Sequence, residues 1–138
     1  MMWLRWLRKL WLLFMATTRR LVLFPDGAVP VTVVGTAGVW GAWGVGAGTQ
    51  LAATVGNRAV HISQIDMSNP TGVVDFEVQI GYGLAAAEVW FGAVTMNLAS
   101  VTLPFPLIVP AGQRLAARCR DSAGGNTVDV KVIAYTIE

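Results

Sequence analysis

The segment Val74-Asp75-Phe76-Glu77-Val78-Gln79-Ile80 indicates the fold class of this chain. Its apolar and polar side chains alternate strictly, and a period of two is typical of a β-strand with one buried face. Seven further segments are rich in β-branched and aromatic residues, and turn sequences separate them. These predicted strands are Val29–Val34, Thr49–Val55, Val60–Met67, Glu88–Leu98, Thr102–Val109, Arg114–Asp121 and Thr127–Ile137. About eight short strands at this spacing predict an all-β fold, either a two-sheet sandwich or a barrel.

Composition and charge limit what such a fold can do. With 138 residues, of which 54% are hydrophobic and 13% charged, the chain has room for one domain with a sizeable core. Residues 1–20 carry five basic side chains and no acidic one, whereas residues 21–138 carry five basic and eight acidic ones. The second part lacks the clustered positive charge that nucleic-acid binding needs. We therefore expect a basic arm at residues 1–20, a β-sandwich domain at residues 21–138 and no nucleic-acid partner.

The chain offers little for catalysis or metal binding. His61 is the single histidine, and Asp66 is expected on the opposite face of a regular strand. Asp75 and Glu77 lie about 6.5–7 Å apart on one strand face, a separation that suits an inverting glycosidase, but their alternating strand favours a solvated face. Cys119 is the single cysteine, so we expect a small buried core residue rather than a disulfide or a metal ligand. The sequence predicts a protein that is not an enzyme, with no catalytic, cofactor or metal site.

A glycine-rich segment, Gly35–Gly48, interrupts the strand pattern. Its six glycines in fourteen residues disfavour a regular strand, and it contains Trp40 and Trp43. It is a flexible loop, an aromatic ligand platform or a segment that packs against another subunit; we favour the last, because indoles supply large contact area. A carbohydrate-binding sandwich is the alternative from another class, with a platform made of Trp40, Trp43, Tyr82 and Trp90. Trp90 and Phe91 are expected on opposite faces of a strand, with at least one of them buried.

Two segments of the C-terminal half carry a resemblance to a known family. They are Val109–Arg118, with the sequence VPAGQRLAAR, and Val128–Tyr135, with the sequence VDVKVIAY. A Pro-Ala-Gly turn before a strand, followed by a terminal alternating strand, resembles the small jelly-roll virion subunits of tailed bacteriophages. The likeness covers about residues 70–138. The same turn also occurs in other jelly rolls, including collagen-like and tumour-necrosis-like trimers.

The resemblance implies a jelly-roll sandwich with a non-enzymatic role in the virion, assembled in the host cytoplasm. From it we favour a trimeric capsid decoration or cement protein, whose partners are further copies of itself and the major capsid protein. A neck, tail or fibre-associated subunit is the alternative. Interface centres are depleted of charge, so the glycine-rich segment and the apolar C-terminal strand are candidate contact surfaces. The candidate interface residues of these two segments are Trp40, Trp43 and Tyr135. Arg118, like Arg114 and Arg120, is a candidate for pairing across an interface, and a solvated strand-face charge is the other interpretation of these three arginines.

Residues 1–20, MMWLRWLRKLWLLFMATTRR, differ from everything that follows. On a helical wheel of residues 3–14, the basic residues share one arc, and they are Arg5, Arg8 and Lys9. Apolar residues cover most of the other side, namely Trp3, Trp6, Leu7, Leu10, Trp11, Leu13 and Phe14, and Leu12 is the one apolar residue among the basic ones. Such a helix is about 21 Å long, shorter than the ~30 Å hydrocarbon core, so we expect no membrane span. Cleavage after Ala16 would place Phe14 where a signal peptide needs a small residue. Two interpretations remain, a start of translation at Met15 and an arm that docks on a neighbouring subunit. We favour the docking arm, with the contact residues Trp3, Arg5, Trp6, Arg8 and Trp11.

Overall fold

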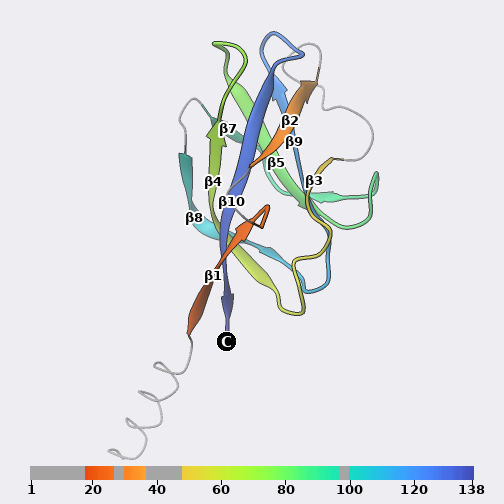
Figure 1. Cartoon of the computed structure of the whole chain (residues 1–138), viewed down its shortest axis with the longest axis vertical. Coiled ribbons are helices and arrows are strands. Elements are labelled where there is room, and N and C mark those ends of the chain that lie inside the picture. The colour runs from red at the N-terminus through yellow and green to blue at the C-terminus, as the bar shows by residue number, and fades with distance from the viewer. Residues whose placement is uncertain (1–17, 27–29, 37–47, 97–99) are drawn as a thin grey trace, which may run out of the picture.

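The computed structural model describes residues 18–26, 30–36, 48–96 and 100–138, and these form ten β-strands (Figure 1). The strands are β1 (Arg19–Phe24), β2 (Val31–Thr36), β3 (Thr49–Ala52), β4 (Val60–Ser68), β5 (Phe76–Tyr82), β6 (Val89–Trp90), β7 (Val94–Met96), β8 (Ser100–Val109), β9 (Leu115–Asp121) and β10 (Thr127–Ile137). The predicted all-β fold is confirmed. The predictions for the arm at residues 1–17 and for Trp40 and Trp43 fall outside the described residues.

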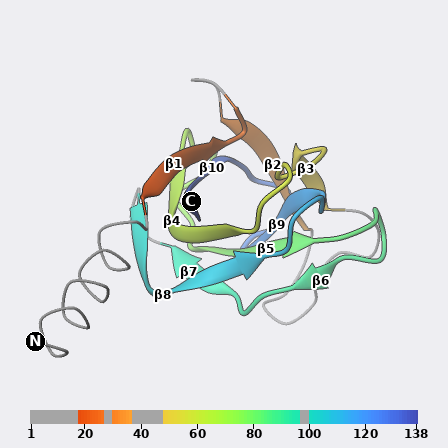
Figure 2. The same ribbon diagram turned by 90° about the horizontal axis from the view of Figure 1, so that it is seen from below.

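The strands form two layers that face each other (Figures 1 and 2). In sheet A, β10 lies between β4 and the strands β1 and β2, which follow one another along the same edge of β10, and β8 pairs with the far edge of β4. In sheet B, β9 lies between β3 and β5, and β6 and β7 follow one another along the far edge of β5. The end of β2 also pairs in parallel with β9 and joins the two sheets. When β1 is counted with β2 and β6 with β7, the strands occupy the eight positions of a jelly roll.

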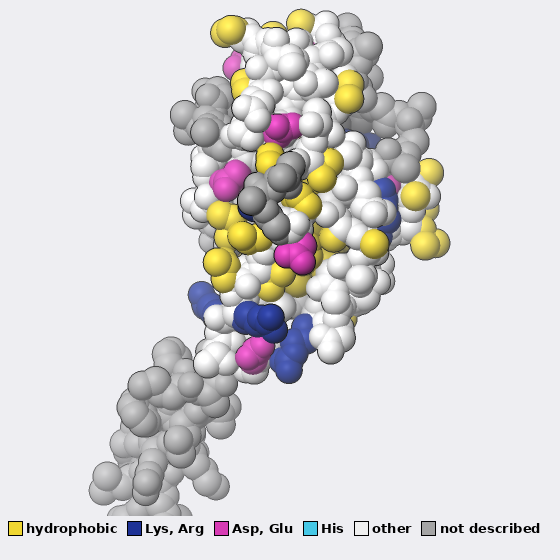
Figure 3. Space-filling view, viewed as in Figure 1, with side chains coloured by type: hydrophobic (Ala, Val, Ile, Leu, Met, Phe, Trp, Pro, Cys, Tyr) yellow, Lys and Arg dark blue, Asp and Glu magenta, His cyan; other side chains and the backbone are white. Residues whose placement is uncertain are grey.

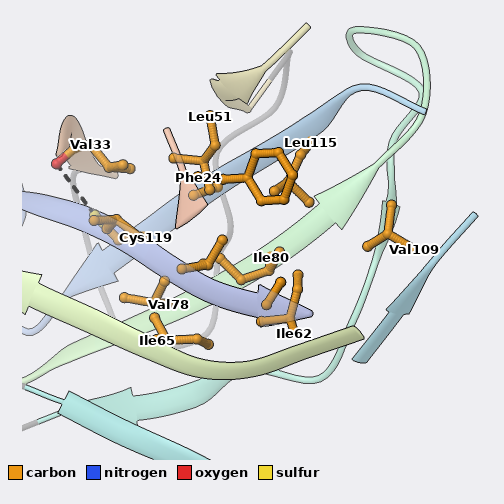
Figure 4. Close-up of a cluster of buried hydrophobic side chains, with 14 of the residues drawn as sticks. Phe24, Val33, Leu51, Ile62, Ile65, Val78, Ile80, Val109, Leu115 and Cys119 are labelled. Atoms are coloured by element: carbon orange, nitrogen blue, oxygen red, sulfur yellow. Dashed lines mark hydrogen bonds between the residues drawn. The ribbon is translucent and has the colours of Figure 1, made fainter. Parts of the chain in front are cut away.

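Strict alternation of side chains builds the core between the sheets. In β10 every second side chain from Val128 to Thr136 is buried. Phe76, Val78 and Ile80 of β5 point into the same layer, and Figure 4 shows part of this cluster. Each Val, Leu, Ile or Phe that is fully buried contributes about 1.5–3 kcal/mol relative to an exposed position. The two alternating strands named in the sequence analysis therefore hold the layers together.

Cys119 lies in this core, as the sequence predicts. Its side chain is buried, and its Sγ donates to the Val33 carbonyl oxygen at 3.7 Å (Figure 4). Burial, with a smaller contribution from the negative charge of Asp121, raises the pKa of Cys119 to about 12. The thiol is therefore protonated and unreactive at neutral pH.

The first strand, β1, was not among the predicted strands. Its register opposite β10 turns Val22 and Phe24 inward and leaves Leu21 outward, so the run is apolar without alternation. The period-two pattern that identifies the other strands is therefore missing here. β1 begins at Arg19, so Arg19 and Arg20, which the sequence analysis assigns to the arm, are part of the sandwich.

The strand predicted over Glu88–Leu98 is interrupted. Both β6 and β7 pair with β5, but residues 91–93 lie opposite only residues 79 and 80. The extra residue is a β-bulge, and Gly92 within it has open space around its α-carbon. Phe91 packs against the core, with its ring centroid 5.6 Å from that of Tyr82. Trp90 lies over the glycines of the outer face, so the expected opposite orientation of Trp90 and Phe91 is confirmed.

Candidate interaction surfaces

The outward face of sheet B carries polar side chains that bond to one another. Glu77 and Gln79 of β5 lie directly opposite Arg120 and Arg118 of β9. Arg120 forms an ion pair with Glu77, whose side chain is only 18% exposed, and Arg118 Nε donates to Gln79 Oε1 at 2.8 Å. The expectation of a solvated Glu77 is therefore wrong, because the register places a guanidinium beside it. Asp75 precedes β5 and is exposed, so the two carboxylates do not form a pair in a cleft.

Trp90 closes one end of this face. A β-carbon at Gly81 would lie 2.5 Å from an indole atom, and one at Gly48 would lie 2.3 Å from another, so only glycine leaves room for the ring at these positions. The guanidinium carbon of Arg118 lies 4.2 Å from the ring centroid, within the range of a cation–π contact. Groups of the same chain thus occupy the surroundings of the Trp90 indole, which a sugar-binding platform would need to be open.

A buried ion pair fixes the point at which the glycine-rich segment rejoins sheet B. The Glu88 side chain is 1% exposed, and its Oε1 accepts hydrogen bonds from Arg114 Nη1 at 2.7 Å and from the Gly48 N–H at 2.9 Å. Arg114 also donates to the Gly48 carbonyl oxygen at 2.7 Å and to Gln50 Oε1 at 3.1 Å. Burial by itself raises the pKa of Glu88, but the hydrogen bonds from Arg114 and Gly48 outweigh burial, and the pKa lies below its ordinary value. Glu88 is therefore a charged structural anchor at neutral pH.

A second buried carboxylate, that of Asp121, organises the loop between β9 and β10. Its oxygens accept hydrogen bonds from the backbone N–H groups of Ala123 at 2.8 Å, Gly124, and Asn126 at 3.1 Å. Burial by itself raises the pKa of Asp121. These hydrogen bonds, together with one from the Asn126 side chain, lower the pKa by more than burial raises it, so the net shift is downward. A β-carbon at Gly35 would lie 2.2 Å from Asp121 Oδ2, so the end of β2 requires glycine to pass this carboxylate.

The outward face of sheet A has a polar half and an apolar half. In the polar half, Asp129 accepts hydrogen bonds from Thr32 Oγ1 at 2.6 Å and Asn69 Nδ2 at 2.8 Å. Lys131 lies opposite Asp66 in the same half. The apolar half consists of Leu21, Leu23, His61, Ile108, Ile133 and Tyr135.

The apolar half crosses four strands, from β1 through β10 and β4 to β8. The Tyr135 and His61 rings stack with 5.0 Å between centroids and 11° between ring planes, and the Arg19 guanidinium carbon lies 4.8 Å from the Tyr135 centroid. At the two ends of this row, Leu21 is 67% and Ile108 is 53% exposed. Figure 3 shows hydrophobic side chains gathered around β1, with basic side chains below them. Exposed apolar patches of this kind mark contact surfaces in soluble proteins.

His61 and Asp66 lie on the same face of β4, so the expectation of opposite faces is wrong. The register places His61 opposite Tyr135 and Asp66 opposite Lys131, and both partners point outward from β10. The cause is a bulge at Ser63, which adds one residue between the two side chains and restores the same orientation. About four strand residues, or roughly 13 Å, still separate them along the sheet, so they do not form a catalytic pair.

A groove of about 750 Å³ runs beside β1; we call it the β1 groove. Its two walls are β1 and residues 51–58, and its apolar lining includes Leu21, Leu23, Phe24, Leu51 and Val55. Among the described strands, β1 pairs only with β10, so its other edge has no strand partner. Among the described residues, no strand pairs with β1 on the side of the groove.

The predicted interface residues lie on different surfaces. Tyr135 lies in the apolar half of sheet A, whereas Arg118 lies in the polar network on the outward face of sheet B. The remaining predicted contacts, Trp3, Arg5, Trp6, Arg8, Trp11, Trp40 and Trp43, fall outside the described residues. Sequence reasoning missed Leu21, Ile108 and Phe105, and Phe105 is 80% exposed. The run Leu-Pro-Phe-Pro-Leu at residues 103–107 was the available signal for Phe105, because strand prolines mark an edge or a bulge.

The described part of the chain holds neither a cluster of metal ligands nor a membrane-spanning helix. Among residues 18–26, 30–36, 48–96 and 100–138, no group of three or more His, Cys, Asp or Glu side chains is placed to hold a metal ion. The same residues contain no helix with the length and apolar character needed to cross a membrane.

No family model and no curated protein sequence matches the chain. Among solved structures, the chain is similar to a chain of the T13 IBDV viral particle, with a TM-score of 0.48 and 9% identity over 86% of this chain. The match spans 31% of the viral chain, so this chain corresponds to about a third of that protein's length. It is also similar to the nucleoplasmin-like N-terminal domain of Drosophila FKBP39, with a TM-score of 0.36, 13% identity and coverage of 89% of this chain and 91% of that one. Neither likeness identifies a function.

Proposed function

We propose that this protein is a non-enzymatic structural subunit of a tailed-phage virion, a capsid decoration or cement protein that acts as a homotrimer. The observation that carries the proposal is the apolar half of sheet A, where Leu21 and Ile108 remain exposed at the ends of a row that crosses the sheet. A second subunit would cover this row, and burial stabilises association by about 25 cal/mol for each Å² of apolar surface removed from water. The jelly-roll arrangement of the strands agrees with the fold that the sequence resemblance implies.

The acidic side chains that a hydrolase would use support a structural role. Glu88 is held by Arg114, Glu77 by Arg120, and Asp121 by backbone N–H groups of its own loop. Charges bound in this way stiffen the sandwich, and their bonds would have to break before they could act as acids or bases. A domain stiffened in this way, with an apolar half on the outward face of sheet A, is suited to contact with a large assembly.

The experiment has two parts, oligomeric state and particle binding. Sedimentation of the full chain across a concentration series should show a trimer. Capsids purified without the protein should then bind it and resist heat or loss of salt better than bare capsids, since a ligand of the assembled state stabilises that state by mass action. A stable monomer that binds no capsid would refute the proposal. Binding to isolated tails or necks instead of heads would favour the alternative location in the virion.

A further inference from the structure

We propose that the β1 groove is the docking site for the N-terminal arm of a second copy of this chain. This inference rests on the homo-oligomer of the proposed function. The proposal names the acceptor surface for an arm whose sequence predicts an amphipathic helix with Trp3, Trp6 and Trp11 on its apolar side. An amphipathic helix that places its apolar side into a hydrophobic groove is a common mode of peptide recognition.

The first support is the shape and lining of the groove. Its lining includes Leu21 and Leu23 of β1 and the edges of the core residues Phe24, Leu51 and Val55, which are 4–8% exposed, and its volume is about 750 Å³. This volume falls within the range of about 300–1,000 Å³ that is typical of pockets for drug-sized ligands. An isolated helix of the length predicted for the arm is only marginally stable in water. Such a helix would gain stability by placing its large apolar indoles in a site of this kind.

The second support is the charge around the groove. The arm from residue 1 to residue 18 has three basic side chains, Arg5, Arg8 and Lys9, and no acidic one. The groove carries two carboxylates, those of Asp26 and Glu138, and neither forms an ion pair among the described residues. The groove also carries Arg20, and Arg58, which donates to the Ile137 carbonyl oxygen at 3.2 Å. Two carboxylates thus remain available to the basic side of the arm, and the groove has no excess of positive charge to repel it.

The third support is the direction in which the chain leaves the domain. The Thr18 carbonyl oxygen accepts a hydrogen bond from the Glu138 N–H at 3.0 Å, so the arm begins at one end of the groove. From that end β1 runs along the groove, and the arm must reverse direction to enter the groove of its own domain. Residues 1–24 contain no Gly, Pro, Asn, Asp or Ser, the residues that tight reversals use. The sequence before β1 therefore disfavours docking in the groove of the same domain and favours docking on a second copy.

A cross-linking experiment with the full chain tests the exchange directly. The variant Trp6→Cys places a thiol on the arm, and Ala53→Cys places one on the exposed rim of the groove. In a mixture of the two variants under mild oxidation, a disulfide-linked dimer of the two chains is expected. The native Cys119 stays silent, because it is buried and its pKa is raised to about 12. Trp6→Cys mixed with Ala85→Cys, which lies in an exposed turn after β5, is the matched control and should give no such dimer.

A second variant tests the contribution of the groove to assembly. Ala53→Lys adds positive charge to the exposed rim of the groove, outside the apolar half of sheet A, where it would repel the basic side of the arm; it should weaken assembly about tenfold or more, as loss of an interface contact worth above 1 kcal/mol does. Ala85→Lys makes the same change in the exposed turn after β5 and should leave assembly unchanged. Circular dichroism and thermal unfolding of each variant establish that it is folded.

The outcomes separate this inference from the function on which it rests. If the unmodified chain sediments as a stable monomer and binds no capsid, both are overturned. A monomer that does bind capsids overturns the exchange and the homotrimer but not the role in the virion. If the chain is an oligomer but the mixture gives no linked dimer, the exchange is overturned and the proposed function stands. A linked dimer together with weaker assembly of Ala53→Lys supports the exchange.

Discussion

The two outward faces of this sandwich arise from the same alternation of side chains, but one face is bonded within the chain and the other keeps apolar side chains exposed. On sheet B, outward Arg118 and Arg120 find Gln79 and Glu77 on the neighbouring strand, so the polar face is bonded within the chain. On sheet A, the outward residues beside β1 are apolar, and Leu21 and Ile108 stay exposed. One face therefore contributes to the stability of the domain, whereas the other is available for association. Substitutions on sheet B should therefore change unfolding, and substitutions on sheet A should change assembly.

The largest effect on unfolding is expected from Glu88→Ala on sheet B. This change leaves the Arg114 guanidinium without its partner in a buried site, and breaking a buried pair in this way costs about 3–5 kcal/mol. Urea unfolding measures the loss. Glu138→Ala, which removes an exposed carboxylate at the end of the chain, should stay within about 0.5 kcal/mol. Equal effects of the two variants would show that the ion pair does not anchor sheet B.

A smaller loss is expected from Gly81→Ala beneath the Trp90 indole. The new methyl group would lie 2.5 Å from the ring, and crowding of this kind costs about 1–3 kcal/mol. Gly92→Ala is the matched control, because a β-carbon there meets nothing within 4 Å and its effect should be within about 1 kcal/mol of zero. The difference in urea midpoint between the two variants is the measurement, and its absence would mean that the indole does not rest on Gly81.

Acid should weaken the domain through its two buried carboxylates. The pKa values of Glu88 and Asp121 are lowered in the folded chain, so their stabilisation is fully present above the unfolded-state pKa of about 4 and is lost as pH falls through the folded-state pKa. The free energy of unfolding should be nearly constant from about pH 7 to about pH 5 and should decrease below that range. Asp121→Asn should reduce this acid dependence. Stability that increases on acidification would contradict the argument.

The smallest effect on unfolding, but a clear effect on assembly, is expected from Ile108→Ser on sheet A. Ile108 is 53% exposed, so the free energy of unfolding should change by no more than about 0.5 kcal/mol. If the apolar half is a contact surface, assembly should weaken about tenfold, as loss of a contact residue typically does. Sedimentation across a concentration series measures this, with Thr102→Ser on the same strand as the control. Unchanged assembly of Ile108→Ser would remove the contrast between the two faces.

Much of the fold could be predicted from the sequence, because alternation reports directly which side of a strand is buried. The segments Val74–Ile80 and Thr127–Ile137 predicted both the class of fold and the inward residues of β5 and β10. Cys119 followed from the same pattern, since it alternates with two arginines in β9. The candidate contact surfaces were harder to predict: Tyr135 lies in the apolar half, but its neighbours Leu21 and Ile108 come from strands far away in the chain.

The period of each strand can be read from the sequence, but the strands and faces that meet are set by tertiary packing. Arg114 and Glu88 are 26 residues apart, and only the pairing of the strands of sheet B brings them together. Arg118 and Tyr135 belong to consecutive strands, yet they lie on opposite outer faces because β9 and β10 belong to different sheets. A single bulged residue at Ser63 places His61 and Asp66 on one face. The physical reason is that side-chain alternation is a local property of the backbone, whereas strand partners, register and bulges are selected by packing across the whole sandwich.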